Sequence, residues 1–430
     1  MSTAVSTQKQ PYRAAAAAFI GTAIEWYDFY IYGFASAIIF GPLFFSTEST
    51  FVAMMASFAT FAIGLLARPF GGMFFGHLGD VLGRKRALVA TLYIMGAATV
   101  GVGCLPTYAQ AGVLAPALLV TLRIFQGLAV GGNWGGAVLM AAEHAPEGRR
   151  AFYASFAQLG SPAGLIMATL AFTGISALPE ESLYSWGWRL PFLASFVLLF
   201  VGQFVRKAVN ESPEFTESLE KDDKDKVKLP VKEVLTKIPK LLMLTIGANC
   251  LGIAGFYFTN TFMLAYTTTY LGLAKNVILN ALFWVAVIQF FSMPINALLG
   301  ERLGVRGYLL FTTGACIFCP YLMFTLVDTG SVAMITLGVG TTIFFIGGCY
   351  ALIAGYVTSL FPIQLRYSGI SMAYQFSGAI FGALTPLLGT ALAERASGDW
   401  MPLAIFFSII SAISFLSLYF IDPKKYKAHE

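Results

Sequence analysis

Twelve long apolar runs decide what this chain can fold into. They cover approximately residues 14–40, 51–77, 87–107, 112–142, 150–176, 187–208, 240–270, 276–299, 307–327, 331–360, 367–393 and 400–421. A helix needs about 20 mainly apolar residues to cross the hydrocarbon core of a bilayer, where every backbone polar group must be paired within the chain. The chain is 57% hydrophobic and 11% charged, whereas soluble domains are about 25% charged. We therefore predict an all-α polytopic membrane protein with twelve transmembrane helices.

A charged and polar stretch divides these runs into two sets of six. We predict an N-terminal six-helix bundle over residues 1–208, a cytoplasmic linker over 209–239 and a C-terminal six-helix bundle over 240–430. The sequence LGDVLGRK after the second run is echoed by LGERLGVR after the eighth, and P-x-x-x-R follows both the fourth and the tenth. Repeats that enter the membrane from the same side indicate two pseudo-symmetric halves, with a substrate site at their interface near mid-membrane.

Lysine and arginine residues predict the orientation in the membrane. With both termini inside, the inner loops and the linker hold nearly all of the 27 Lys and Arg residues, and the outer loops hold Arg189, Lys275 and Arg395. Positively charged loops stay in the cytoplasm, so we expect both termini to be cytoplasmic. These loops also account for the net charge of +5, and we expect no nucleic-acid partner.

Four charged side chains lie well inside the apolar runs of the first half, away from the ends of the runs. Glu25 and Asp28 are three residues apart in the first run, on one face of a helix, and Arg68 and Arg123 lie in the second and fourth runs. A rise of about 1.5 Å per residue puts Asp28, Arg68 and Arg123 near the middle of the bilayer. Unpaired charge is costly there, so two acids and two arginines suggest ion pairs that exchange partners. Protonation of Asp28 would free an arginine for a substrate carboxylate, which a guanidinium binds with two parallel hydrogen bonds.

The second half offers amide and phenol side chains instead of charge. We expect it to supply hydrogen bonds and aromatic walls for a polar substrate, through Tyr257, Asn260, Gln289, Tyr374 and Gln375.

Several motifs resemble those of the major facilitator superfamily. GHLGDVLGRKR at 76–86 is similar to its inner-loop motif, although Val81 stands where a basic residue is usual, and RIFQG at 123–127 is similar to the R-x-x-Q-G of its fourth helix. Within the superfamily, the chain resembles the metabolite:proton symporters, and the shikimate-transporter branch in particular. This resemblance rests on EWYDFYIYG at 25–33, RPFGG at 68–72, RIFQGLAVGG at 123–132, WGGA at 134–137 and WGWRLPF at 186–192.

The resemblance implies a proton-coupled symporter that imports a small organic acid, shikimate-like or another carboxylate, by alternating access. It further implies a bacterial cytoplasmic (inner) membrane and, we expect, a monomer. We assign proton coupling to Asp28, Glu25 and Arg123. We assign substrate binding in the first half to Arg68, Arg123, Tyr27, Tyr30, Gln126, Asn133 and Trp134. We assign gating to Asp80 and Arg84, and to their counterparts Glu301 and Arg306 in the second half.

One position departs from the shikimate-like branch. Asn133 stands where that branch usually has Glu before the tryptophan of the fourth helix, so one site carboxylate is missing. The assigned residues also have structural alternatives: Asp28 in a fixed ion pair, Glu25 facing a neighbouring helix, Arg123 as a hydrogen-bond hub, and Arg68 as a brace.

Other functions remain as alternatives: a proton-driven exporter of small molecules, a proline/betaine-type zwitterion symporter, and a transporter-like sensor that does not transport. We expect no enzyme, because the sequence contains no Walker motif and no HExxH, and it has only three His. We expect no cofactor or metal either. The Cys316-x-x-Cys319 spacing has no second pair or nearby His beside it, so we interpret these cysteines as packing residues.

Overall fold

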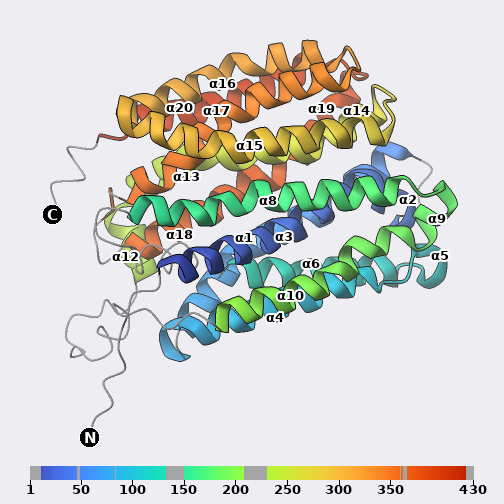
Figure 1. Cartoon of the computed structure of the whole chain (residues 1–430), viewed down its shortest axis with the longest axis horizontal. Coiled ribbons are helices and arrows are strands. Elements are labelled where there is room, and N and C mark those ends of the chain that lie inside the picture. Colours follow the sequence, from blue (N-terminus) through green and yellow to red (C-terminus); the bar gives the residue numbers. More distant parts are fainter. Residues whose placement is uncertain are drawn as a thin grey trace, which may run out of the picture.

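A computed structural model of the chain describes residues 11–45, 49–82, 84–131, 150–207, 230–358, 360–361 and 366–422. The regular structure of these residues is helical, and it forms twelve long helical segments that run side by side (Figure 1). The boundaries of the predicted runs are met to within a few residues over most of the chain. The predicted fold class, a twelve-helix membrane protein, is thereby confirmed.

Six long helices form the first half. They are α1 (Pro11–Ile38), α3 (Thr50–Leu82), α4 (Arg84–Gly103), α6 (Leu114–Gly131), α8 (Arg150–Ser176) and α10 (Leu190–Lys207). Four short helices connect them at the end of the molecule where α1 finishes: α2 (Phe40–Phe44), α5 (Tyr108–Ala111), α9 (Glu180–Ser185) and η1 (Gly187–Arg189).

Six long segments also form the second half. The first is a continuous rod of α13 (Pro239–Phe256), the π-helical turn η3 (Tyr257–Phe262) and α14 (Met263–Thr269). It is followed by α15 (Lys275–Leu303), α16 (Val305–Val327) and α17 (Val332–Thr358). The fifth segment again contains a π-helical turn, in the order α18 (Arg366–Ser377), η5 (Gly378–Gly382) and α19 (Ala383–Arg395), and α20 (Met401–Phe420) is the last.

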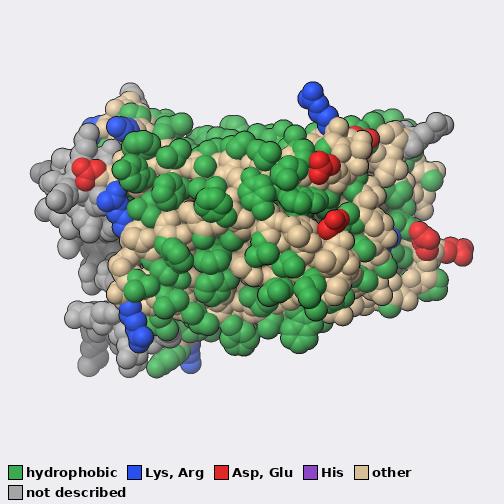
Figure 2. Space-filling view, turned by 90° about the horizontal axis from the view of Figure 1, so that it is seen from above, with side chains coloured by type: hydrophobic (Ala, Val, Ile, Leu, Met, Phe, Trp, Pro, Cys, Tyr) green, Lys and Arg blue, Asp and Glu red, His purple; other side chains and the backbone are tan. Residues whose placement is uncertain are grey.

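The outer surface matches a lipid environment. Within the described residues, nine helices are long and apolar enough to cross a membrane. Figure 2 shows apolar side chains over the middle of the face in view, with most of its Lys and Arg residues toward the end where α1 begins and α20 finishes. Phenylalanine side chains that are more than half exposed occur on several helices, at Phe70, Phe74, Phe196, Phe291 and Phe318. Apolar surface of this kind is stable in contact with lipid and unfavourable in contact with water.

Glycines bring α3 and α6 close together. A Cβ atom at Gly127 would meet the carbonyl oxygen of Gly64, and one at Gly131 would meet the carbonyl oxygen of Arg68. These two glycines are four residues apart, so they lie on one face of α6 and form the small-residue contact typical of membrane helices. The backbone of α3 at Arg68 is therefore held directly against α6.

A second glycine pair joins α1 to α8. A Cβ atom at Gly160 would lie 2.7 Å from the backbone nitrogen of Ala23, and one at Gly164 would lie 2.8 Å from the carbonyl oxygen of Ala23. The segment from Gly160 to Gly164 contains Pro162, yet α8 continues through it as one helix. Its glycines thus fix how close α8 comes to the helix that carries Glu25 and Asp28.

The two halves meet along three lines of contact. The helix α1 packs against η3 and α14, α3 packs against α18, η5 and α19, and α8 packs against α15. Both π-helical turns therefore lie at this interface. Gly33 allows the approach of η3, since a Cβ atom there would lie 2.9 Å from the Thr261 hydroxyl.

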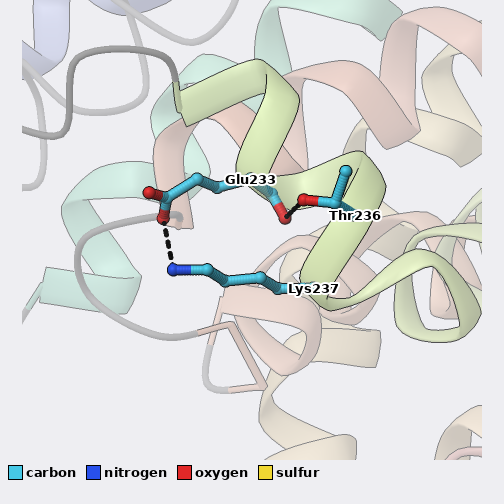
Figure 3. Close-up of polar contacts among 3 residues, drawn as sticks. All are labelled: Glu233, Thr236 and Lys237. Carbon is cyan, nitrogen blue, oxygen red and sulfur yellow. Dashed lines mark hydrogen bonds and ion pairs between the residues drawn. The ribbon is translucent and has the colours of Figure 1, made fainter.

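The described end of the interdomain segment forms a short helix, α12 (Pro230–Lys237), within the predicted linker. Lys237 Nζ lies 3.2 Å from Glu233 Oε2, and the Thr236 hydroxyl donates to the Glu233 carbonyl at 3.5 Å (Figure 3). Exposed pairs of this kind contribute about 0.3–0.5 kcal/mol, so they support the local helix without fixing the two halves.

Candidate functional site

Asp28 is buried inside the first half, where two hydroxyl groups bind its carboxylate. Its side chain is 3% exposed. The Ser195 hydroxyl of α10 donates to Asp28 Oδ1 at 2.7 Å, and the Thr99 hydroxyl of α4 donates to Asp28 Oδ2 at 3.0 Å. Each oxygen of the acid thus has its own hydroxyl partner on a different helix.

Arg123 is also buried, and aromatic rings surround its guanidinium group. Its side chain is 1% exposed, and its guanidinium carbon is 4.0 Å from the centre of the Tyr32 ring, 4.8 Å from that of Phe29 and 5.1 Å from that of Phe61. Ring faces attract a desolvated cation by about 2 kcal/mol, which offsets part of the cost of burial. Arg123 Nη1 donates to Gln126 Oε1 at 3.1 Å, and its Nε and Nη2 make no hydrogen bond with the described residues.

A chain of hydrogen bonds connects Arg123 to Asp28. Gln126 binds the guanidinium through its oxygen, and its Nε2 donates to Thr99 Oγ1 at 2.8 Å. Thr99 in turn donates to Asp28. The sequence suggested ion pairs between the two acids and the two arginines. For Asp28 and Arg123, the described residues join acid and arginine through Thr99 and Gln126. Asp28 and Arg123 remain close enough to act on each other electrostatically.

Arg68 approaches the same site from α3. Its side chain is 4% exposed, and its guanidinium carbon is 3.9 Å from the centre of the Phe29 ring. Its Nε makes no hydrogen bond with the described residues. The guanidinium groups of Arg68 and Arg123 thus both contact the Phe29 ring. Each has at least one N–H donor without a hydrogen-bond partner among the described residues.

A tyrosine cluster lies between the halves, next to Arg68 and Glu25. We use this name for Tyr30, Tyr257, Tyr350 and Tyr374. Tyr30 lies close to Tyr257 and Tyr374. Arg68 and Glu25 both act on Tyr257 and Tyr374.

Hydrogen bonds and ring contacts hold the cluster across the interface. The Tyr350 and Tyr374 hydroxyls are 3.2 Å apart. Asn260 Nδ2, from the second half, donates to the Tyr30 hydroxyl of α1 at 3.3 Å. Trp26 covers one side, with ring centres 5.5 Å from Tyr30 and 6.3 Å from Tyr257.

The second half contributes amide groups that are buried without full pairing. Gln289 is 0% exposed, and neither its amide oxygen nor its amide nitrogen has a partner among the described residues. Asn260 Oδ1 and Gln375 Oε1 are also unpaired there, although Gln375 Nε2 donates to the Gly131 carbonyl at 3.0 Å. Buried polar groups are usually paired, so these atoms are candidates to bind a ligand.

Two of the predicted binding residues make structural contacts. Tyr27 donates to the Pro191 carbonyl at 2.8 Å, so its hydroxyl joins α1 to α10. Gln126 lies in the hydrogen-bond chain described above. Asn133 and Trp134 lie outside the described residues.

The predicted gating residues are placed in part. The side chains of Asp80 and Arg84 lie outside the described residues. Glu301 is exposed near the end of α15, and Arg306 Nη2 donates to the Tyr419 carbonyl at 3.0 Å, which joins the start of α16 to the end of α20.

Sequence reasoning missed Thr99, Ser195 and Tyr350. A serine or threonine in a membrane helix gives little signal, because its hydroxyl can pair with the helix's own backbone, as Thr169 does with the Leu165 carbonyl. In the described part of the chain, no group of three His, Cys, Asp or Glu residues could hold a metal ion.

Similarity to known proteins agrees with this architecture. The chain is 36% identical to the shikimate transporter of Escherichia coli strain K12 over 414 residues, which cover 94% of this chain and 93% of that protein. It is 33% identical to the glycine betaine/proline/ectoine/pipecolic acid transporter of Dickeya dadantii, over 94% of this chain and 82% of that one. These relatives are membrane transporters and not enzymes.

The fold is shared with a solved transporter of low sequence similarity. The partially occluded, inward-open xylose transporter of E. coli superimposes with a TM-score of 0.74 at 15% identity, over 95% of this chain and 96% of that one. The model of the Major Facilitator Superfamily matches residues 18–383. Family match, relatives and twelve-helix architecture therefore agree that this chain is a membrane transporter of the major facilitator superfamily.

Proposed function

We propose that the chain is a proton-coupled symporter that imports a small hydroxylated carboxylate by alternating access. The observation that carries this proposal is the placement of Asp28, Arg123 and Arg68. Two acids, Glu25 and Asp28, and two arginines are buried together in the first half, beside the interface with the second half. With a proton on Asp28, the two guanidinium groups would face only the negative charge of Glu25, and one substrate carboxylate would then restore the balance.

The unpaired donors and acceptors of the site support a ligand that carries a carboxylate at one end and hydroxyl groups at the other. The first half presents donors, at Arg68 Nε and at Arg123 Nε and Nη2. The second half presents acceptors, at the amide oxygens of Asn260, Gln289 and Gln375. A carboxylate would satisfy the donors, and hydroxyl groups would satisfy the acceptors. Shikimate-like acids carry both, and the similarity to a shikimate transporter points the same way.

A zwitterion is the second candidate, because aromatic rings stand close to the arginines. Trp26, Tyr30 and Tyr257 form adjoining ring contacts, and ring faces bind quaternary ammonium groups well. The similarity to a betaine and proline transporter also favours this class. Betaine has no hydroxyl or N–H donor, however, so it would leave the amide oxygens unpaired.

The driving force for accumulation is adequate. A potential of 100 mV supplies about 2.3 kcal/mol for each net charge moved, and one pH unit supplies about 1.36 kcal/mol for each proton. We further propose that the protein works as a monomer in the bacterial inner membrane, with both termini and the α12 end in the cytoplasm. The Lys and Arg residues at that end (Figure 2) support this orientation.

Uptake into proteoliposomes tests the proposal. The purified chain is reconstituted, and entry of labelled shikimate is followed with and without an imposed inward proton gradient. We expect the gradient to drive accumulation, a protonophore to abolish it, and unlabelled shikimate to compete better than glycine betaine. Uptake that ignores the proton gradient would contradict symport. Transport only out of the vesicles would indicate an exporter, and binding without flux would indicate a sensor.

A further inference from the structure

We infer that Thr99 is a positioning residue that holds Gln126 between Asp28 and Arg123 and sets the pH at which Asp28 takes up a proton. This inference rests on the proposed function, because it assumes that Asp28 takes up the coupled proton. It concerns a residue of α4 that does not face the interface between the halves.

Thr99 stands at the meeting point of three hydrogen bonds. Its Oγ1 lies 3.0 Å from Asp28 Oδ2, 3.0 Å from the Met95 carbonyl oxygen and 2.8 Å from Gln126 Nε2. Its side chain is fully buried. A hydroxyl has one hydrogen to donate and two lone pairs that accept. Because Gln126 Nε2 can only donate, Asp28 and the Met95 carbonyl compete for the single hydrogen of Thr99.

The two acceptors define two complete arrangements. When Asp28 is ionised, Thr99 donates to Oδ2 and its bond to Met95 is given up. When Asp28 takes up a proton on Oδ2, the carboxyl donates to Thr99 Oγ1, and the hydrogen of Thr99 turns to the Met95 carbonyl. The Gln126 amide donates to Thr99 in both arrangements. One proton is added, and no O–H bond of Thr99 breaks.

Ser195 selects the oxygen that takes the proton. It donates to Asp28 Oδ1 at 2.7 Å and, unlike Thr99, has no second acceptor among the described residues, so it keeps this bond in both arrangements. The proton is thereby directed to Oδ2, which faces Thr99. Asp28 Oδ2 thus accepts a hydrogen bond from Thr99 before protonation and donates one to Thr99 Oγ1 afterwards.

Thr99 and Gln126 also separate the acid from the arginine. The Gln126 nitrogen is held by Thr99, which turns its oxygen toward Arg123 Nη1. This spacing keeps Asp28 from a direct ion pair, so loss of its negative charge is felt by Arg123 without a large movement. Arg123 then presents its unpaired Nε and Nη2 to a substrate carboxylate.

Other charged and titratable groups surround this pair, and the test must leave them unchanged. Glu25 and Tyr27 of α1 and Arg123 of α6 act directly on Asp28 or are acted on by it. Arg123 is in turn influenced by Arg68 of α3, Tyr32 of α1 and Tyr257 of η3. From α4 and α10, Asp28 receives the hydroxyls of Thr99 and Ser195. A change at Thr99 alters none of these charges.

The test compares Thr99→Val with Thr99→Ser. Valine keeps the shape and removes the hydroxyl, whereas serine restores it. Thr99→Val removes a hydrogen bond from both forms of the acid, but the bond to the ionised carboxylate is charge-assisted and the stronger of the two. The ionised form therefore loses more stabilisation, and the proton stays bound to higher pH. We expect the pH profile of proton-driven shikimate uptake to move upward by about one pH unit, with counterflow exchange retained. Thr99→Ser should follow the parent protein.

Thr169→Val is the matched control. Thr169 is also a fully buried threonine of the first half, but its hydroxyl bonds to the Leu165 and Ile166 carbonyls of its own helix. We expect its pH profile to equal that of the parent. A parental profile in Thr99→Val would overturn this role of Thr99. So would an equal shift in Thr99→Ser, or loss of counterflow in Thr99→Val. Failure of the parent protein itself to respond to a proton gradient would instead overturn the proposed function.

Discussion

Arg68 and Arg123 come from different helices, and both place their guanidinium groups against the ring of Phe29. Their guanidinium carbons are 3.9 Å and 4.8 Å from its centre. Two buried cations so close together repel each other, and ring contacts offset only part of that cost. The pair therefore needs negative charge nearby. Glu25 and Asp28 supply it in this structure, and a substrate carboxylate is proposed to supply it during transport.

Replacement of Arg68 by lysine tests the role of the planar guanidinium. Lysine keeps the charge but loses the two-pronged hydrogen bond and the stacked contact with Phe29. A hydrogen bond to a charged group contributes about 1.5–3 kcal/mol, so we expect the KM of uptake to rise roughly 10- to 100-fold. Arg395→Lys, at an exposed position at the end of α19, is the control and should leave KM unchanged. A parental KM in Arg68→Lys would remove Arg68 from the proposed binding site.

Replacement of Gly127 by alanine tests the close contact of α3 with α6. Its Cβ would collide with the Gly64 carbonyl and with the Ala67 side chain at 2.8 Å. Overpacking of this kind costs about 1–3 kcal/mol, so we expect a clear fall in Tm in detergent.

Gly174→Ala is the matched control for this substitution. Gly174 lies in α8, and no atom beyond its own helix backbone and chain neighbours lies within 4 Å of a Cβ placed there. Alanine is favoured over glycine in a helix by about 1 kcal/mol, so Tm should stay level or rise. Equal Tm values for Gly127→Ala and Gly174→Ala would show that α3 and α6 are less tightly packed than described.

Replacement of Lys275 by methionine tests a bridge between the halves at the end away from α12. Lys275 Nζ donates to the Tyr184 hydroxyl at 3.1 Å, and Tyr184 donates to the Ile38 carbonyl at 3.2 Å. A partly exposed contact contributes up to about 1 kcal/mol. We therefore expect Lys275→Met to increase the population that is open at this end by up to about fivefold.

Spin labels measure this opening. They are attached at Val113→Cys and Ser331→Cys in a Cys104→Ala background, because Val113 and Ser331 are exposed on opposite halves at that end, and Cys104 is the exposed native cysteine among the described residues. The distance between the two labels is longer when this end is open, so we expect the longer distances to be more populated in Lys275→Met. Lys240→Met, at an exposed position at the start of α13, should match the parent. Unchanged distances in Lys275→Met would show that this bridge does not hold the halves together.

The fold was predictable because the length of an apolar run is a direct physical signal. A span of about 20 residues must be a helix in a bilayer, and runs such as 150–176 were placed with the observed bounds of α8. The π-helical turns η3 and η5 could not be predicted in this way. A turn that is one residue wider has the same apolar composition as the α-helix around it.

Charge was the clearest signal of the site in the sequence. Asp28, Arg68 and Arg123 stand out in apolar runs, and all three are buried. The hydroxyls of Thr99 and Ser195 do not stand out, and their role depends on where α4 and α10 pack against α1. The same packing explains why Tyr27 bonds to Pro191, while Tyr30, three residues further along α1, contacts the second half through Asn260.

Proton movement during substrate entry tests the central claim most directly. Vesicles containing a pH-sensitive dye hold the reconstituted parent protein or Asp28→Asn, and shikimate is added outside with no proton gradient imposed. Because entry of substrate should carry protons inward, we predict that the interior acidifies in the parent. Asp28→Asn should give no acidification while its counterflow exchange persists. Substrate entry without acidification in the parent, or parental acidification in Asp28→Asn, would contradict proton coupling at Asp28.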